Sequence, residues 1–199
     1  MRSGDDGAHV ASLGLRIGMA DHLVSESLYL WDPHGLGIEV YADRPRTAWR
    51  RNGSELAMAT DPLDTEDVIA EGAGVRWDGA PAGTTMEHVH LNVGHLDTAE
   101  AFYHRRVGFD KTVWSYPGAL FMAAGGYHHH LGTNVWSPGP APGPDEARLL
   151  ERELVVPSSG DVAAVGENLR AADYETDPRS DGLVTANPWG TRVRIVAET

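Results

Sequence analysis

Residues 87–110, EHVHLNVGHLDTAEAFYHRRVGFD, contain the pattern from which the fold is predicted. In the first part of this stretch apolar residues occupy every second position from Val89 onward, which predicts a strand with one apolar and one polar face. The second part begins at Asp97, a good helix N-cap, and ends at Gly108, a residue typical of helix C-termini. We therefore expect a strand followed by a short helix over 97–107.

Three further strands are predicted directly after this helix. They cover 111–116, 120–124 and 127–135, and Pro117-Gly118 forms the turn between the first two. The order of elements is then βαβββ, so residues 86–136 form one motif.

The same order of elements returns after a linker rich in proline and glycine, residues 137–144. Its predicted elements are a strand over 150–156, a helix over 161–172 capped by Asp161, and strands over 182–186 and 193–196. Residues 146–197 are therefore expected to form a second βαβββ motif.

A short internal repeat links the two ends of the chain. Residues 32–40, DPHGLGIEV, and 187–195, NPWGTRVRI, both combine a turn of the form D/N-P-x-G with a following strand. The two copies differ at one important position, where Glu39 of the first copy is Arg194 in the second. If one copy binds a metal cation, we expect it to be the first.

The part of the chain before residue 86 contains one predicted hairpin, with strands over 27–30 and 38–41. The segment that follows, residues 46–85, is rich in Arg, Asp, Gly and Pro. We expect it to be an irregular connection with one short helix near 64–70.

Charge and composition exclude several classes of partner. The sequence has 16 Lys and Arg against 29 Asp and Glu, a formal net charge of −13, and its arginines cluster only between Arg44 and Arg51. Because a nucleic-acid-binding surface needs concentrated basic residues, we expect no nucleic-acid partner. No run approaches the roughly 18 apolar residues of a membrane span, and the first residues contain no secretory signal. We therefore expect a cytoplasmic protein without a membrane partner.

Histidine is the residue type most suited to hold a metal in this chain, which has ten histidines and no cysteine. His88 and His90 lie two apart on a predicted strand and would face the same side. A second cluster, His128 to His130, lies on another predicted strand, where the middle histidine would face away from its neighbours. The alternative interpretation is an exposed strand face and a surface tract.

Glu39, His22 and Tyr29 lie in or beside the first predicted hairpin. Two histidines and one carboxylate are the ligand set of non-haem Fe(II) oxygenases, and this set suits a borderline divalent cation. The alternative is that Glu39 is an outward-facing carboxylate and that His22 and Tyr29 are structural polar residues.

Four stretches of the chain resemble the vicinal oxygen chelate superfamily of glyoxalases, bleomycin-resistance proteins and extradiol dioxygenases, and look most like its two-module, catechol 2,3-dioxygenase-like branch. The matching stretches are DHLVSESLYLWDPHGLGIEVYADRP (21–45), the stretch 87–110, GALFMAAGGYHHHLGTNVW (118–136) and NPWGTRVRIV (187–196). The resemblance implies an α+β fold in which paired βαβββ motifs form open, curled β-barrel modules around a metal. Residues 1–45 would be the C-terminal part of a first, incomplete module, and residues 86–199 would form the complete second module. Residues 46–85 would be the irregular connection between these two modules.

The resemblance also implies roles for five residues. His88 takes the place of the metal histidine of the first strand, and Glu39 that of the glutamate ligand. His129 resembles a histidine beside the metal that handles protons and oxygen, while His22 and Tyr29 resemble residues that orient a phenolic substrate. The implied metal is Fe(II), with Mn(II) or Zn(II) as alternatives.

The implied activity is that of an oxidoreductase: Fe(II) chelates a catechol or related phenol, O₂ binds beside it, and the ring undergoes extradiol cleavage. A histidine is needed to accept and deliver protons near neutral pH. One alternative is a metal-free or degenerate protein that sequesters an aromatic small molecule, as bleomycin-resistance proteins do. A glyoxalase-like isomerase or lyase is a further alternative.

Relatives in this branch carry four motifs, whereas this chain begins inside the second. Residues 8–20 are expected to be the end of a helix, so the strand with the second metal histidine would be missing. We consider three explanations: the chain is truncated, His128 or His130 completes the ligand set, or the protein works without metal. A missing strand leaves an unpaired sheet edge, so we expect a homo-oligomer, namely a dimer.

Overall fold

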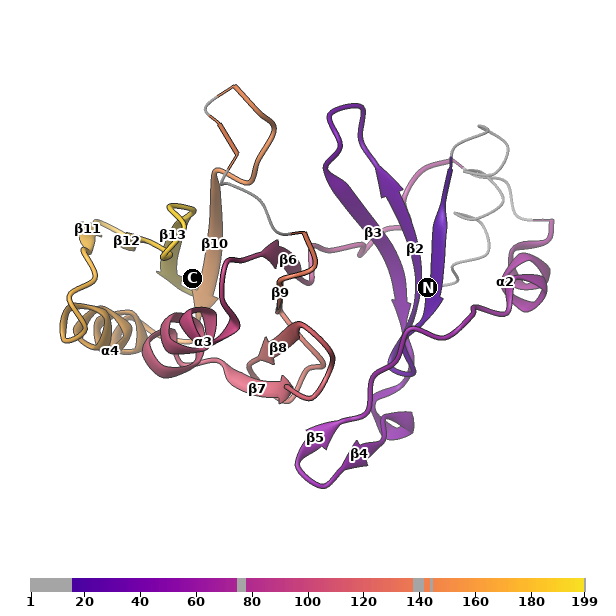
Figure 1. The fold of residues 1–199 in the computed structure, drawn as a ribbon, viewed down its shortest axis with the longest axis horizontal. Coiled ribbons are helices and arrows are strands. Elements are labelled where there is room, and N and C mark those ends of the chain that lie inside the picture. Colours follow the sequence, from indigo (N-terminus) through magenta and orange to yellow (C-terminus); the bar gives the residue numbers. More distant parts are fainter. Residues whose placement is uncertain (1–15, 75–77, 138–141, 144, 199) are drawn as a thin grey trace. The chain divides into compact units, whose positions relative to one another are not determined.

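A computed structural model describes residues 16–74, 78–137, 142–143 and 145–198. The chain divides into two compact units, Met1–Glu87 and His88–Thr199. It has a mixed α+β fold, as predicted, in which every sheet is small and accompanied by short helices (Figure 1). Within the described ranges, no helix has the length and apolar character that crossing a membrane requires.

The first unit is built on an antiparallel three-stranded sheet of order β1-β2-β3 (Figure 1). Its strands are β1 (Gly18–Asp21), β2 (Ser25–Trp31) and β3 (Gly37–Asp43). The helix predicted over 8–20 is therefore wrong from residue 16 onward, and residues 8–15 lie outside the described residues. Glycine is a poor helix former, and here Gly18 pairs with Tyr29 of β2, so the strand pairing prevails.

The predicted hairpin of the first unit is confirmed, with longer strands than expected. Its turn is closed by Asp32, whose Oδ1 accepts hydrogen bonds from the backbone N–H of His34 at 2.9 Å and of Leu36 at 2.7 Å. Gly35 has φ of +86°, a conformation that glycine adopts without strain. The turn is therefore determined by residues within five positions of one another.

The segment after β3 is more regular than predicted. It contains a single-turn helix η1 (Arg46–Ala48), the two-residue strands β4 (Arg51–Asn52) and β5 (Glu55–Leu56), and α2 (Thr65–Gly72). The predicted short helix is confirmed, and Asp64 caps it by accepting from the N–H of Asp67. The β4–β5 hairpin was not predicted, because strands of two residues show no periodicity.

The second unit contains two sheets of the same kind, and in each a helix connects the first strand to the second. The first motif consists of β6 (Val89–Asn92), α3 (Leu96–Ala99) continuing as the π-helical η2 (Glu100–Val107), β7 (Asp110–Val113), β8 (Ala119–Ala123) and β9 (Leu131–Asn134). The second consists of β10 (Glu151–Val156), α4 (Ser159–Arg170), β11 (Asp177–Arg179), β12 (Gly182–Ala186) and β13 (Arg192–Ala197).

The sheet orders are β6-β9-β8-β7 and β10-β13-β12-β11, so in both sheets the first strand runs parallel to the last. This is the predicted βαβββ arrangement. The short edge strand β11 was not predicted, because all three of its residues are exposed and the alternation that marks a half-buried strand is absent.

Both helix starts in the second unit differ from the prediction. The N-cap of α4 is Ser158, whose Oγ accepts from the N–H of Asp161 and donates to the Asp161 carboxylate at 2.6 Å. Because Ser158 caps the helix, Asp161 belongs to its first turn instead of preceding it. In the same way Asp97 lies in the first turn of α3, whose N-cap is His95. Gly108, with φ of +102°, ends η2 as expected.

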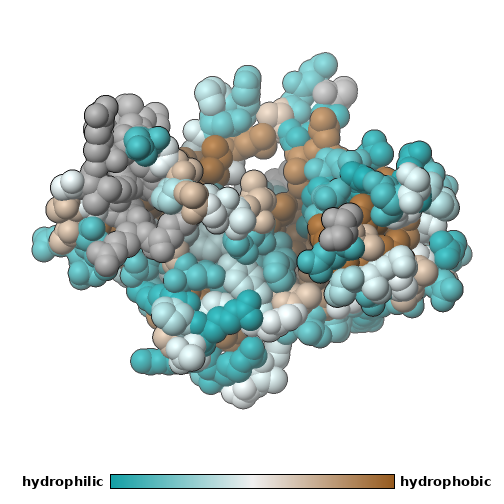
Figure 2. Space-filling view, turned by 180° about the vertical axis from the view of Figure 1, so that it is seen from behind, coloured by the Kyte–Doolittle hydropathy of each residue, from teal (hydrophilic) through white to brown (hydrophobic). Residues whose placement is uncertain are grey.

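The core of the second unit lies between its helices and its two sheets. η2 and α4 pack against each other (Figure 1), and the buried cluster between helices and sheets includes Phe102, Tyr103, Leu131, Leu169 and Ile195. The outer surface is mixed: hydrophilic residues cover most of the face in Figure 2, with hydrophobic areas between them.

The strand predicted over 127–135 begins only at Leu131. Gly125 and Gly126 both have positive φ, +60° and +69°, so the chain turns there and the next residues form bends instead of a strand. The expected alternation of the histidines is therefore wrong: His128 and His129 are both buried, at 0% and 6% exposure.

Candidate functional site

The hairpin of the first unit places a tyrosine and a glutamate side by side. Tyr29 of β2 and Glu39 of β3 are direct cross-strand partners in the antiparallel register. Side chains of such partners lie on the same face of a sheet, only about 5 Å apart at Cβ. The Tyr29 hydroxyl accordingly lies 3.0 Å from Oε1 of Glu39 and donates a hydrogen bond to it.

His22 completes this group from the turn between β1 and β2. Its Nε2 lies 2.5 Å from the Tyr29 hydroxyl and 3.8 Å from Oε1 of Glu39. The His22 and Glu39 side chains are only 13% and 15% exposed, so the group is shielded from most of the solvent. The first unit thus brings three of the five predicted site residues together.

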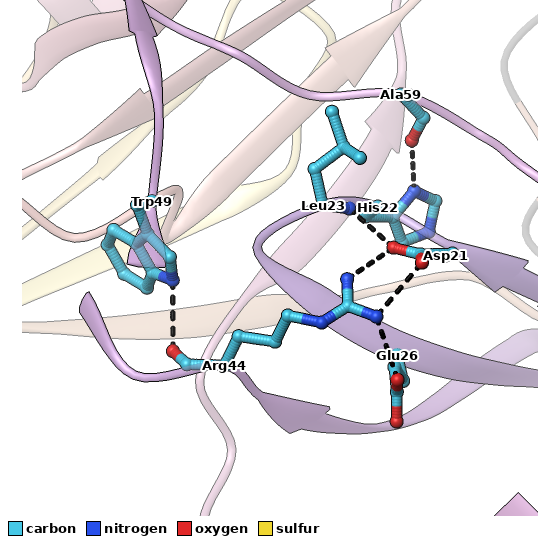
Figure 3. A network of polar contacts seen from close by, with 7 residues as sticks. All are labelled: Asp21, His22, Leu23, Glu26, Arg44, Trp49 and Ala59. Atoms are coloured by element: carbon cyan, nitrogen blue, oxygen red, sulfur yellow. Dashed lines mark hydrogen bonds and ion pairs between the residues drawn. The ribbon is translucent and has the colours of Figure 1, made fainter. Parts of the chain in front are cut away.

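A backbone carbonyl determines which nitrogen of His22 carries its proton. Nδ1 of His22 lies 2.6 Å from the carbonyl oxygen of Ala59 (Figure 3). Because a carbonyl oxygen only accepts, Nδ1 must carry a hydrogen and donate it. In the neutral imidazole Nε2 therefore has no hydrogen and accepts from the Tyr29 hydroxyl.

The group of His22, Tyr29 and Glu39 can consequently hold one additional proton. The single hydroxyl hydrogen of Tyr29 faces two acceptors, Nε2 of His22 and Oε1 of Glu39. When Nε2 is protonated it donates to the tyrosine oxygen, and the hydroxyl hydrogen turns to Glu39. A proton gained at Nε2 is therefore accompanied by a hydrogen bond from the Tyr29 hydroxyl to the Glu39 carboxylate.

An ion-pair network holds the turn that carries His22. Arg44 donates to both carboxylate oxygens of Asp21 and, at 2.8 Å, to Glu26 (Figure 3). The hydrogen bond from the Arg44 guanidinium holds the pKa of the Asp21 carboxyl below its usual value. Asp21 also accepts from the N–H of Leu23, whose φ of +68° marks a tight turn.

The segment that supplies the Ala59 carbonyl is held by β1, the strand that ends at Asp21. Asp21 and Asp61 exchange two backbone hydrogen bonds of 2.9 Å each, which makes an isolated antiparallel bridge. Ala59 lies two residues before this bridge, so the position of its carbonyl is tied to β1. Nothing in the sequence signalled this contact, since 37 positions separate Ala59 from His22.

The second unit contains a separate group of three histidine rings. The ring of His88 lies 4.3 Å from that of His129 and 6.5 Å from that of His128, measured between centroids. Nδ1 of His128 lies 2.7 Å from Nδ1 of His129, so one of the two must donate a hydrogen and the other accept it. His128 and His129 therefore cannot both be imidazolium in this arrangement.

The sequence-predicted residues are thus found in two groups. His22, Tyr29 and Glu39 lie together in the first unit, and His88 lies beside His129 in the second. The pairing of His88 with Glu39 as metal ligands joins residues of different units and stays a prediction. Among the described residues, no group of three or more His, Asp or Glu side chains has a spacing that could hold a metal ion.

The family of the chain follows from its sequence similarity. The Glyoxalase/Bleomycin resistance protein/Dioxygenase superfamily matches residues 85–191, more than half of the chain. The chain therefore belongs to this superfamily, as its resemblance to the vicinal oxygen chelate proteins implied. The matched range includes the first βαβββ motif and the second motif as far as the turn before β13.

A relative of known name extends the similarity over both units. The chain is 40% identical over 186 residues to a catechol-2,3-dioxygenase of Bacillus subtilis (strain 168), and the match covers 91% of this chain. It covers 65% of the relative, so the chain spans about two thirds of the length of that protein.

Several solved structures are similar at low identity. They include lactoylglutathione lyase from Agrobacterium tumefaciens, with 18% identity over 59% of this chain and 96% of that chain at a TM-score of 0.44. The antibiotic binding protein TnmS3 from Streptomyces sp. CB03234 has 19% identity over 60% of this chain and 100% of that chain at 0.45. The 2,3-dioxygenase LapB from Pseudomonas sp. KL28 has 15% identity over 96% of this chain and 65% of that chain at 0.39. None of these similarities bears on the reaction or the ligand of this chain.

Proposed function

We propose that the chain functions as a metal-dependent extradiol ring-cleaving dioxygenase acting on a catechol or a related phenolic small molecule, with O₂ as the second substrate. The observation that carries the proposal is the Tyr29 hydroxyl held between Nε2 of His22 and the carboxylate of Glu39. The 40% identity to a catechol-2,3-dioxygenase supports it. The proposal includes a homodimer in the cytoplasm.

A divalent metal fits the chemistry of these donors. A carboxylate and imidazole nitrogens suit Fe(II), and also Mn(II) or Zn(II), and the sequence offers no thiolate as a competing ligand. In this proposal Glu39 and His88 hold the metal. When bound, the metal supplies a positive charge that favours a catecholate anion, together with the redox chemistry that activates O₂.

His22 is proposed to accept the proton of a substrate hydroxyl at Nε2. The carbonyl of Ala59 keeps the hydrogen of the neutral ring on Nδ1, so Nε2 is the basic atom. Tyr29 then orients the substrate oxygen and relays the hydrogen bond to Glu39. Because both side chains come from one rigid hairpin and its adjoining turn, their geometry requires no rearrangement of the sheet.

His129 is proposed to move protons beside His88. The two rings lie 4.3 Å apart between centroids, and His129 is in hydrogen-bond contact with His128. His129 can therefore receive a proton from His128 or pass one to it.

A second candidate function is the sequestration of an aromatic small molecule without metal. It is favoured by a group of aromatic rings in the second unit. The ring of Phe121 contacts the rings of Tyr116 and His90, and the ring of Trp136 contacts the same two rings. The distances between ring centroids are 5.6–6.2 Å. Trp136 is 51% exposed, so this aromatic surface is accessible within its unit.

The test of the proposed reaction is iron content and O₂ uptake. The chain is loaded anaerobically with Fe(II), freed of unbound metal and mixed with catechol. We expect the Glu39→Gln variant to lose bound iron and uptake together. The His22→Asn variant should keep its iron while kcat falls by about 10²-fold, the usual contribution of a general base.

His34→Asn is the matched control for His22→Asn, because His34 lies in the exposed hairpin turn outside the group. Its iron content and O₂ uptake should equal those of the wild type. Absence of both bound iron and O₂ uptake in the loaded wild type would overturn the proposal. Tight binding of catechol that persists in chelator, without uptake, would instead favour sequestration.

A further inference from the structure

Arg152, the second residue of β10, is a buried cation in the second unit. Its side chain is only 7% exposed, and its guanidinium carbon lies 4.5 Å from the ring centroid of Tyr103 on η2. Such stacking of a guanidinium on an aromatic face is favourable, but it leaves the N–H groups at the rim of the guanidinium without acceptors.

Arg152 differs from the other arginines of the described residues in its burial. Nε and Nη2 of Arg152 are buried and have no hydrogen-bond partner. Several exposed or half-buried arginines contact a carboxylate, namely Arg44, Arg105, Arg179, Arg192 and Arg194. In contrast, no carboxylate of the described part of the chain lies within 4.0 Å of a nitrogen of Arg152. Arg152 is thus the arginine of the described residues that is buried, and it lies there without an anion.

The two atoms without partners lie on the same edge of the guanidinium. The N–H bonds of Nε and Nη2 point in parallel, and this edge matches the two oxygens of a carboxylate. Burial without an anion disfavours the charged form and lowers the pKa of Arg152 from its ordinary value. An anion on this edge would relieve that cost, because buried charges in proteins are normally paired.

The ring beneath Arg152 is held firmly. The hydroxyl of Tyr103 accepts a hydrogen bond of 2.8 Å from Nδ2 of Asn187. Asn187 in turn accepts from two backbone N–H groups of its turn, those of Trp189 and Thr191. The platform on which the guanidinium rests is therefore pre-organised for a ligand.

Arg152 lies on the outermost strand of its sheet. β10 is an edge strand of its sheet, and Leu150, two residues before Arg152, is 63% exposed. Because Arg152 itself is almost fully covered, only a small ligand can reach its edge without disturbing the packing.

We propose that the Nε–Nη2 edge of Arg152 is a binding site for a small free carboxylate of the size of formate or acetate, seated beside the ring of Tyr103. The site uses none of the residues assigned to the proposed reaction. It would therefore bind its ligand whether or not the protein cleaves catechol, and the test below needs no activity.

Formate is the probe, and equal ionic strength in sodium chloride is the reference. In about 100 mM formate we expect the Tm of the wild type to exceed that in chloride by about 2–4 °C, because a ligand that binds only the folded state stabilises it. Arg152→Met should abolish this difference. Arg192→Met removes an exposed arginine of the neighbouring strand, and this control should retain it.

A direct titration complements the melting experiment. Isothermal titration calorimetry of the wild type with formate should give one saturable site per chain. Arg152→Lys keeps the positive charge but lacks the two parallel N–H groups, so its Kd should rise about tenfold or more. This variant keeps the test decisive if Arg152→Met does not fold.

Two results would overturn the proposal. The first is no difference between formate and chloride in the wild type, and the second is a formate response of the same size in Arg152→Lys.

Discussion

Replacing Asn187 by alanine is expected to lower the free energy of unfolding of the second unit by about 3 kcal/mol. The Asn187 side chain is 5% exposed and makes three hydrogen bonds: it accepts from Trp189 N–H at 3.0 Å and Thr191 N–H at 2.9 Å, and it donates to Tyr103 at 2.8 Å. Each such bond contributes about 1 kcal/mol, and the buried Tyr103 hydroxyl would lose its donor.

The first unit provides a matched control for this substitution. Asp32 makes the same two turn hydrogen bonds, to His34 and Leu36, but at an exposed site and without a third partner. Water replaces these bonds when the side chain is removed, so Asp32→Ala should cost about 1 kcal/mol or less.

Urea denaturation followed by far-UV circular dichroism measures these losses. Because the chain has two units, hydrogen exchange of peptides from 182–197 and from 25–43 assigns each transition to its unit. Equal losses for Asn187→Ala and Asp32→Ala would refute the reasoning, since the difference in burial would then have no energetic effect.

Two further substitutions test the packing around the sites. Arg44→Met removes the ion pair with Asp21, whose pKa lies below its ordinary value of 3.8, so the wild type should be more stable than the variant by about 1 kcal/mol at pH 7. A lowered carboxyl pKa stabilises the folded state only while the group is ionised, so this advantage should disappear as the pH falls below 3.8. Urea denaturation of both proteins at pH 7 and at a pH below 3.8 measures the difference in stability. A difference that is the same at the two pH values would contradict the assignment. Gly182→Ala would place a Cβ 2.0 Å from the carbonyl oxygen of Ile195 and should cost more than about 3 kcal/mol, whereas Gly37→Ala meets open space and should melt like the wild type. A Gly182→Ala variant with wild-type thermal stability would show that β12 and β13 separate easily.

Sequence periodicity predicted most of the second unit because its elements are marked by local patterns. Alternation from Val89 onward identified β6, and the glycine stop at Gly108 identified the end of η2. It failed where local signals were ambiguous: Ser158 and Asp161 are both good caps, and only the reciprocal hydrogen bonds between them show which one precedes α4. The predicted alternation of the histidines before Leu131 failed for another reason, because two glycines with positive φ interrupt the strand.

The sequence by itself determined the two turns of the internal repeat. Asp32 and Asn187 each bond backbone groups two and four residues ahead, and Gly35 and Gly190 share a φ of +86°. All the groups that make these turns lie within five consecutive residues, so the pattern of letters is enough to predict them.

Only the tertiary structure decided the contacts that determine chemistry. The tautomer of His22 depends on a carbonyl 37 positions away, and the buried guanidinium of Arg152 depends on Tyr103 and β10 being brought together by the core. The physical reason is that protonation and burial depend on neighbours in space, which are set by packing between distant segments. The residue types that can bind a metal, a proton or an anion were therefore visible in the sequence, and their partners were not.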